Sequence, residues 1–154
     1  MYYPHHHHTT ETCRLTRILR TIGGGGYGQN IGALGSTDPT FASRVPEREA
    51  AYTINFGWYN NEFQYYLPSY YGQPTPDLTN FDEYGHLTQV VWKGTTTVGC
   101  GTSYCPAGSI FAAPFPAWYT VCNYGPAGNV IGAFDTNVLP PQGAATILNL
   151  PNSI

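Results

Sequence analysis

Four cysteines limit the folds that are open to this chain of 154 residues: Cys13, Cys100, Cys105 and Cys122. An even number of cysteines, in a chain whose single lysine is Lys93, is typical of proteins that fold in an oxidising extracellular compartment. Four cysteines allow three pairings. At this length we expect one domain over residues 1–154, large enough to fold without a metal ion. The first expectation is therefore a secreted, disulfide-bonded domain.

Composition narrows the class further. Charged residues make up 10% of the chain, against about 25% in an average domain, whereas Gly (18), Pro (13) and Tyr (13) are abundant. An aromatic content of 15% indicates a packed, loop-rich domain rather than a disordered chain. The net charge is −3 and the arginines Arg14, Arg17 and Arg20 form no larger basic stripe, so nucleic acid is not an expected partner. The sequence contains no run of 18 apolar residues, so no transmembrane helix is predicted.

The N-terminal region carries two patterns. Residues 1–12 contain His5 to His8 and no apolar signal-peptide core, so we interpret them as a tag or an irregular N-terminal segment. Residues 12–21 have the apolar spacing of a helix, and the glycines of residues 23–28 then predict a flexible turn. That turn lacks the Lys-Ser/Thr of a phosphate-binding loop.

A helix is predicted from Pro46 to about Tyr66. Proline in the first turn, followed by Glu47 and Glu49 at the positive end of the helix dipole, is a typical start. The predicted inward-facing stripe is Ala51, Ile54, Trp58 and Glu62. A carboxylate on this stripe needs a partner or a water-filled cleft, unless it lies in solvent beyond the core.

The rest of the chain is predicted to contain a long loop and two strands. Residues 65–83 form a loop rich in Pro, Tyr and Gly, and loops of this length are usually functional or mobile. Thr96 to Gly101 and Ala117 to Tyr124 have the β-branched and aromatic content of strands. Three prolines between the strands exclude a tight hairpin.

Two sequence motifs then become specific. GHLTQVVW at residues 85–92, followed by VGCG at 98–101, and YTVCNYGPAGNV at 119–130 occur in the order and at the spacing of two family signatures. GQNI at 28–31 and WYNNE at 58–62 agree with two shorter family elements. On these motifs the chain resembles the CAP superfamily of cysteine-rich secretory, antigen 5 and pathogenesis-related proteins, in a form similar to fungal pathogenesis-related proteins.

The resemblance implies an α+β fold. Family members form an α-β-α sandwich with a three-stranded antiparallel sheet, and a short helix at Thr88 to Trp92. It also implies the pairs Cys100–Cys122, on strands that the family places side by side, and Cys13–Cys105. Only twelve residues precede Cys13, so the first helix of the family is expected to be absent.

The resemblance also locates a cleft, in altered form. Family members carry two histidines and two glutamates there, a tetrad that can bind a divalent cation. Glu62 and His86 match two of these positions, but Gln29 stands where the family has Glu, and Arg17 where it has His. Two ligands are fewer than zinc sites use, so we expect no metal, no cofactor and no catalytic residue at this degenerate tetrad. We interpret His86 and Glu62 as a structural hydrogen bond.

Three functions were compared on this basis. The resemblance favours binding of a sterol or fatty acid at the loop before the first signature, whose candidate residues are Tyr65, Tyr66, Tyr70, Tyr71, Leu78, Phe81 and Tyr84. The alternative is a secreted effector that binds a host protein or a glycan. A metal-dependent hydrolase is the least favoured of the three. We expect a secreted monomer that is not an enzyme.

Overall fold

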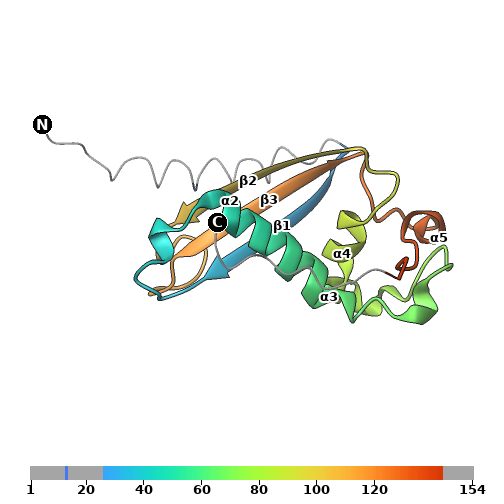
Figure 1. Cartoon of the computed structure of the whole chain (residues 1–154), viewed down its shortest axis with the longest axis horizontal. Helices are drawn as coiled ribbons and strands as arrows, with labels where there is room; N and C mark the ends of the chain where they lie inside the picture. Colours follow the sequence, from blue (N-terminus) through green and yellow to red (C-terminus); the bar gives the residue numbers. More distant parts are fainter. Residues whose placement is uncertain (1–12, 14–25, 144–154) are drawn as a thin grey trace, which may run out of the picture.

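The computed structural model describes Cys13 and residues 26–143. A three-stranded antiparallel sheet runs along the molecule, formed by β1 (Gly28–Gly35), β2 (Thr97–Cys105) and β3 (Ala117–Gly125). Its order is β1-β3-β2, so the last strand in the chain lies in the centre (Figure 1). The α+β fold class and the three-stranded antiparallel sheet predicted from the sequence are confirmed.

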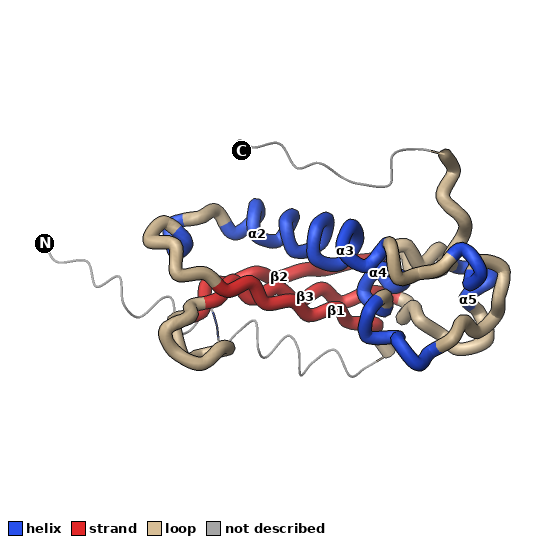
Figure 2. Tube along the Cα trace, turned by 90° about the horizontal axis from the view of Figure 1, so that it is seen from below, coloured by secondary structure: helices blue, strands red, loops and turns tan. Residues whose placement is uncertain are grey.

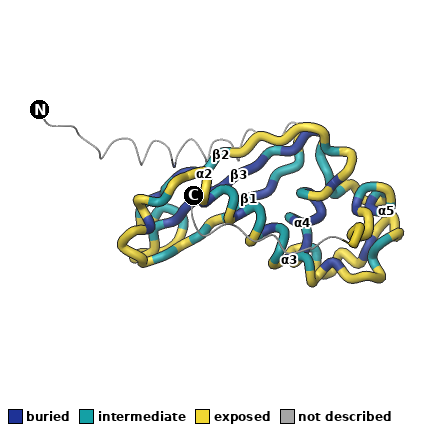
Figure 3. The backbone as a smooth tube through the Cα atoms, viewed as in Figure 1, coloured by how far each residue is buried: buried dark blue, intermediate teal, exposed yellow. Residues whose placement is uncertain are grey.

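The central strand is buried on both faces. Nearly every residue of β3 is buried, whereas the first half of β2 is exposed (Figure 3). Trp118, Thr120 and Cys122 alternate along β3 with Ala117, Tyr119 and Val121, as the two-residue period of a strand requires. Both predicted strands are present with slightly longer bounds, but β1 begins at Gly28, where the glycine content had suggested a flexible turn.

Both disulfides expected from the resemblance are present. Cys100 and Cys122 face each other in the β2–β3 register, with their Cα atoms 4.1 Å apart. Cys13 is joined to Cys105, the last residue of β2, and packs with Tyr119 and Val121 on the second face of the sheet. Three expectations concern residues outside the described ones, apart from Cys13. They are the missing first helix of the family, the helix at residues 12–21 and the tag or irregular segment at 1–12.

A long helix covers the first face of the sheet (Figure 2). It runs through α2 (Pro46–Tyr52), a π-helical segment (Thr53–Asn60) and α3 (Asn61–Phe63). The start at Pro46 is confirmed, with Glu47 and Glu49 in the first turn. The helix ends at Phe63, short of the predicted Tyr66.

The π-helical segment changes which side chains face the sheet. The fully buried positions are Glu49, Thr53, Trp58 and Glu62, whereas Ala51 and Ile54 are only partly buried. One turn of a π-helix contains more residues than one turn of an α-helix, so a step of five residues, from Thr53 to Trp58, returns to the same face of the helix. The predicted stripe is therefore confirmed at Trp58 and Glu62, and Ile54 packs against the cluster of Trp58, Cys122 and Tyr124, while Ala51 is only partly buried.

Short helices and loops lie together beyond the end of the sheet where β1 begins and β3 ends (Figure 1). The chain passes through 3-10 turns at Pro68–Tyr70 and Leu78–Glu83, into α4 (Gly85–Val90), and later into α5 (Phe134–Asn137). The short helix expected at the first signature is thus present, beginning slightly earlier than predicted. A further 3-10 turn, Phe41–Ser43, precedes α2 at the opposite end (Figure 1). Among the described residues, no helix is long and apolar enough to span a membrane.

Candidate functional site: a polar cleft beside a tyrosine cluster

Glu62 and His86 meet where α3 contacts α4. The Oε1 atom of Glu62 lies 2.6 Å from His86 Nδ1, and its Oε2 accepts a hydrogen bond from the backbone N–H of Leu87 at 2.9 Å. Glu62 is 9% exposed. The carboxylate on the inward stripe therefore has partners, and the alternative of a Glu62 side chain in solvent is excluded.

The imidazole of His86 is held from a second side by Trp58. The two rings stack with centroids 5.7 Å apart and an interplanar angle of 13°. Asn30, buried in β1, donates from Nδ2 to the backbone carbonyl of His86 at 3.0 Å. These contacts fix the ring so that its Nε2 edge is the one left for a ligand.

The two signature motifs hold each other through side-chain amides. Gln89 accepts from the N–H of Gly128 at 2.9 Å, and a Cβ atom on Gly28 or Gly128 would overlap its amide group. Asn129, with φ of 55°, accepts from Thr88 Oγ1 at 2.7 Å and donates to the carbonyl of Gly85 at 2.8 Å. Glycine at 28 and 128 is therefore required by close approach to Gln89.

These residues surround a cavity of about 340 Å³, lined by Gln29, Asn30, Phe81, Asp82, Gly85, His86 and Asn129. Gln29 donates from Nε2 to Asn123 Oδ1 at 2.6 Å. Two of the four degenerate-tetrad residues, Gln29 and His86, thus line the cavity, and Glu62 holds His86 from behind. The fourth, Arg17, lies outside the described residues.

The donors around this cavity do not fit a divalent cation. The Gln29 side chain is a neutral amide, and both carboxylate oxygens of Glu62 are already engaged. Across the described part of the chain, no three His, Cys, Asp or Glu side chains are grouped so that they could hold a metal.

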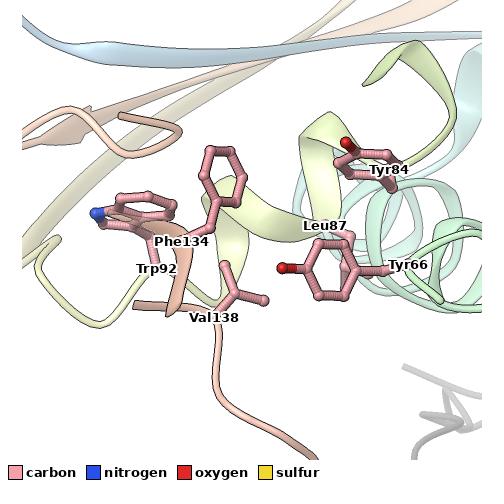
Figure 4. Close-up of a cluster of buried hydrophobic side chains, with 6 residues drawn as sticks. All are labelled: Tyr66, Tyr84, Leu87, Trp92, Phe134 and Val138. Atoms are coloured by element: carbon pink, nitrogen blue, oxygen red, sulfur yellow. The ribbon is translucent and has the colours of Figure 1, made fainter. Parts of the chain in front are cut away.

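A cluster of aromatic rings lies beside the cleft, under the loop of residues 65–84. Tyr66 and Tyr84 are buried with Leu87, Trp92, Phe134 and Val138 (Figure 4). The Tyr66 ring makes edge contacts with Tyr70, Tyr71 and Tyr84, at centroid distances of 5.0 to 5.5 Å. We call these four tyrosines the tyrosine cluster.

The predicted loop residues fall into two sets. Tyr66 and Tyr84 face the core beneath the other rings of the loop, and their contact with a ligand stays a prediction. Tyr65 and Leu78 are exposed, and Tyr70, Tyr71 and Phe81 are partly buried. Burial of large rings inside the loop stabilises it more than their exposure would.

The hydroxyl groups of the two buried tyrosines differ. Tyr84 donates to the carbonyl of Asp77 at 2.7 Å, whereas the Tyr66 hydroxyl is buried and has no hydrogen-bond partner among the described residues. Desolvation in this apolar setting raises the pKa of Tyr66, and likewise of Tyr84, to about 12. An orphaned buried hydroxyl is uncommon and needs an explanation.

Sequence reasoning missed three residues that build the site. Asn30, Gln89 and Asn129 belong to the motifs, but the sequence alone assigns them no role. The one available signal was Asn129 after Gly128, because asparagine tolerates a positive φ better than most residues. Their partners are 39 to 56 residues away in the chain, so the sequence could not pair them.

Comparisons with known proteins agree with this geometry. The family model for CAP, the cysteine-rich secretory protein family, matches residues 3–124. A "Probable pathogenesis-related protein" of Arthroderma benhamiae is 41% identical over 127 residues, covering 82% of this chain and 37% of that protein. "Secreted protein RBT4" of Candida albicans is 34% identical over 129 residues, covering 77% of this chain and 28% of that protein.

A solved structure is also similar. The structure described as "Crystal structure of NaASP2 with Zn2+" superposes with a TM-score of 0.51 at 31% identity, covering 71% of this chain and 48% of that one. The chain thus spans less than half the length of each of these three proteins.

Proposed function

Because this chain belongs to the CAP family of cysteine-rich secretory proteins, we propose that it is a secreted protein that binds a sterol, or a similar small apolar ligand with one hydroxyl, at the loop of residues 65–84. It acts by binding rather than by catalysis.

The Tyr66 hydroxyl carries this proposal. It points toward Val138 in the apolar cluster (Figure 4) and lacks a partner among the described residues. A buried hydroxyl without a hydrogen bond costs about 1–3 kcal/mol. A ligand that is apolar except for one hydroxyl would remove that cost and bury its rings against aromatic side chains.

The loop around Tyr66 supports the same conclusion. The outward-facing side chains of Tyr65 and Leu78, 45% and 36% exposed, extend the apolar surface beyond the cluster. Three prolines (Pro68, Pro74 and Pro76) restrict the loop, which lowers the entropy lost when a ligand orders it. In this proposal the ligand lies between the exposed side chains, Tyr65 and Leu78, and the buried rings of the tyrosine cluster.

Non-catalytic action is supported by the state of the cleft. Both oxygens of Glu62 hold structural partners, and a neutral Gln29 stands beside His86. His86 alone retains a ring edge toward the cavity. The cavity lining offers this imidazole no hydroxyl or thiol to activate, which is a poor basis for hydrolysis.

The binding proposal is tested with radiolabelled cholesterol and ergosterol. Saturable binding is expected for the wild-type protein and a marked loss for Tyr70→Ala/Phe81→Ala. Phe115→Ala is the matched control, because Phe115 is 46% exposed in the connection between β2 and β3, at the opposite end of the sheet. Equal binding by all three proteins, or none by the wild type, contradicts the proposal.

A protein-binding role is the second candidate. Val130, the last residue of the second signature, and Ile131 after it are 51% and 69% exposed. Gly132, next to them, donates from its backbone N–H to Thr75 Oγ1 of the loop. An exposed apolar pair beside the loop is the kind of surface that a partner protein covers. If the sterol assay fails, Ile131→Asp is the variant to compare in partner capture.

A further inference from the structure

A second cavity lies beside the start of α2, at the opposite end of the sheet from the tyrosine cluster. Figure 1 shows the start of α2 and the helix α4 toward opposite ends of the sheet. Its volume is about 560 Å³, and its walls come from the end of β1, the 3-10 turn Phe41–Ser43 and α2. Most of the lining is polar, including Ser36, Thr40, Ser43, Arg44, Arg48 and Glu49. Neither the family signatures nor the cleft at His86 involve these residues.

Glu49 is the unusual member of this cavity. It is 2% exposed, and its Oε2 atom is buried without a hydrogen-bond partner in the part of the chain that the structure describes. Its Oε1 lies 3.7 Å from Arg44 Nη1, a distance too long for a good hydrogen bond. Buried carboxylate oxygens are normally satisfied, so Oε2 indicates a missing donor.

The two arginines of the cavity differ in their engagement. Arg44 is held by Asp38 Oδ2 at 3.0 Å from Nη2, and its guanidinium lies over the Phe41 ring at 5.0 Å. Arg48 is exposed and has no ion pair with any residue of the described ranges. The cavity therefore offers one acceptor without a donor and one guanidinium without an anion.

These two groups select the ligand. A cationic donor would approach Glu49 beside Arg44 and Arg48, which repel it, whereas a hydroxyl donates without adding charge. A carboxylate suits the planar guanidinium of Arg48. Tyr52, 38% exposed and stacked on Phe56 at 5.0 Å, adds an aromatic ring for packing against the apolar face of a sugar.

We propose that this cavity binds an acidic saccharide, whose hydroxyl donates to Glu49 and whose carboxylate pairs with Arg48. The exposed side chains of Arg48 and Tyr52 shift to admit it. This site is separate from the proposed sterol site, so either can exist without the other.

The test uses isothermal titration calorimetry of the whole protein with trigalacturonate and cellotriuronate, and with their methyl esters as neutral counterparts. The wild type is expected to bind at least one acid more tightly than its ester. Glu49→Gln should weaken binding at least about tenfold, since it removes an acceptor in a charge-assisted hydrogen bond. Arg48→Ala should abolish the preference for acid over ester.

Glu47→Gln is the matched control, because Glu47 is exposed on the same helical turn and does not line the cavity. It should leave binding unchanged. The melting temperature of Glu49→Gln should change little, because a buried carboxylate with one unpartnered oxygen and a long ion pair to Arg44 is replaced by a neutral group of the same shape. No binding of either acid by the wild type, binding of the esters as tightly as the acids, or unchanged binding by Glu49→Gln would overturn the proposal.

Discussion

At the scale of single residues, the buried polar side chains of this chain differ in whether they have partners. Glu62 is satisfied twice, by Leu87 and His86, and it ties the end of the long helix to α4. Tyr66 and Glu49 each keep one buried oxygen without a partner among the described residues. We infer that Glu62 stabilises the fold and propose that the Tyr66 hydroxyl and Glu49 Oε2 bind ligands.

Truncation of Glu62 tests the first of these roles. Glu62→Ala leaves the Leu87 N–H unpaired in a buried place and removes the carboxylate partner of the partly exposed His86 ring, and should lower the free energy of unfolding by about 2–3 kcal/mol. Glu62→Gln keeps one acceptor oxygen and should cost less, about 1 kcal/mol. Urea unfolding measures both. Glu47→Ala, at an exposed position, is the control, and an equal loss for it and Glu62→Ala would contradict the role.

The pKa values of the buried tyrosines predict a loss of stability in alkali. Burial raises the pKa of Tyr66 and of Tyr84 from 10.0 to about 12. Above pH 10 the unfolded chain therefore releases these protons while the folded chain retains them. Stability should be unaffected below pH 10 and fall as the pH rises from 10 to 12. Tyr66→Phe should make the fall in melting temperature shallower, and an unchanged slope would contradict the assignment.

At the scale of elements, the long helix and β1 approach each other closely. A Cβ atom on Gly32 would lie 2.6 Å from Thr53 Cγ2 and 3.1 Å from Trp58 Nε1, so glycine is needed there. Thr53 and Trp58 are the two residues that the π-helical segment brings to one face. The contact is thus the point where strand and helix are fitted together.

Substitution of Gly32 measures this fit. Gly32→Ala should destabilise the protein by about 1–3 kcal/mol, the usual cost of overpacking. Adding Thr53→Ser removes the methyl group in the way and should restore part of the loss. Gly99→Ala in β2 is the control, since its Cβ would meet nothing within 4 Å. The measurement is the free energy of unfolding of the four proteins, and no rescue by Thr53→Ser would contradict the close approach.

The elements also show how far the sequence could be interpreted. Pro46 and the acids after it locate the helix start, because capping is a local property. The π-helical segment could not be predicted, because it is associated with the close contact of Thr53 and Trp58 with Gly32, a residue that is distant from them in sequence. For the same reason β1 could not be recognised in the sequence. It begins in a glycine-rich stretch, and its glycines are explained by close contacts with side chains from other elements, such as Gln89 at Gly28.

The tyrosines of the loop mark the same limit at the candidate site. The motifs placed Glu62 and His86 together, and the structure confirms that contact. Composition could show that residues 65–84 are rich in aromatic rings, but not which rings face inward. The burial of Tyr66 and Tyr84 depends on Trp92 and Phe134, which come from other segments of the chain.

At the scale of the whole molecule, two disulfides join distant parts of the chain. Cys13–Cys105 spans 92 residues and Cys100–Cys122 spans 22. On loop-closure entropy, replacing the first pair by serine should cost about 4–5 kcal/mol, and the second about 3–4 kcal/mol. Guanidinium unfolding of the two double variants checks the order. A larger loss for the Cys100→Ser/Cys122→Ser variant would contradict the entropic explanation.

The molecule as a whole carries two candidate ligand regions, one at each end of the sheet. The tyrosine cluster and the cleft at His86 lie beside α4, and the Glu49 cavity lies beside the start of α2. Since no residue lines both cavities, variants at one end serve as controls for the other. The function we propose rests on the end that contains Tyr66.

The most direct test of that function is the coupling between two hydroxyl groups. Dissociation constants are measured for cholesterol and for 5-cholestene, which lacks the hydroxyl, with the wild type and with Tyr66→Phe. Tyr65→Phe, an exposed neighbour, is the control. The wild type should prefer cholesterol by about tenfold, the worth of one buried hydrogen bond, and Tyr66→Phe should bind both ligands equally. A preference for cholesterol that survives in Tyr66→Phe would contradict the proposed site.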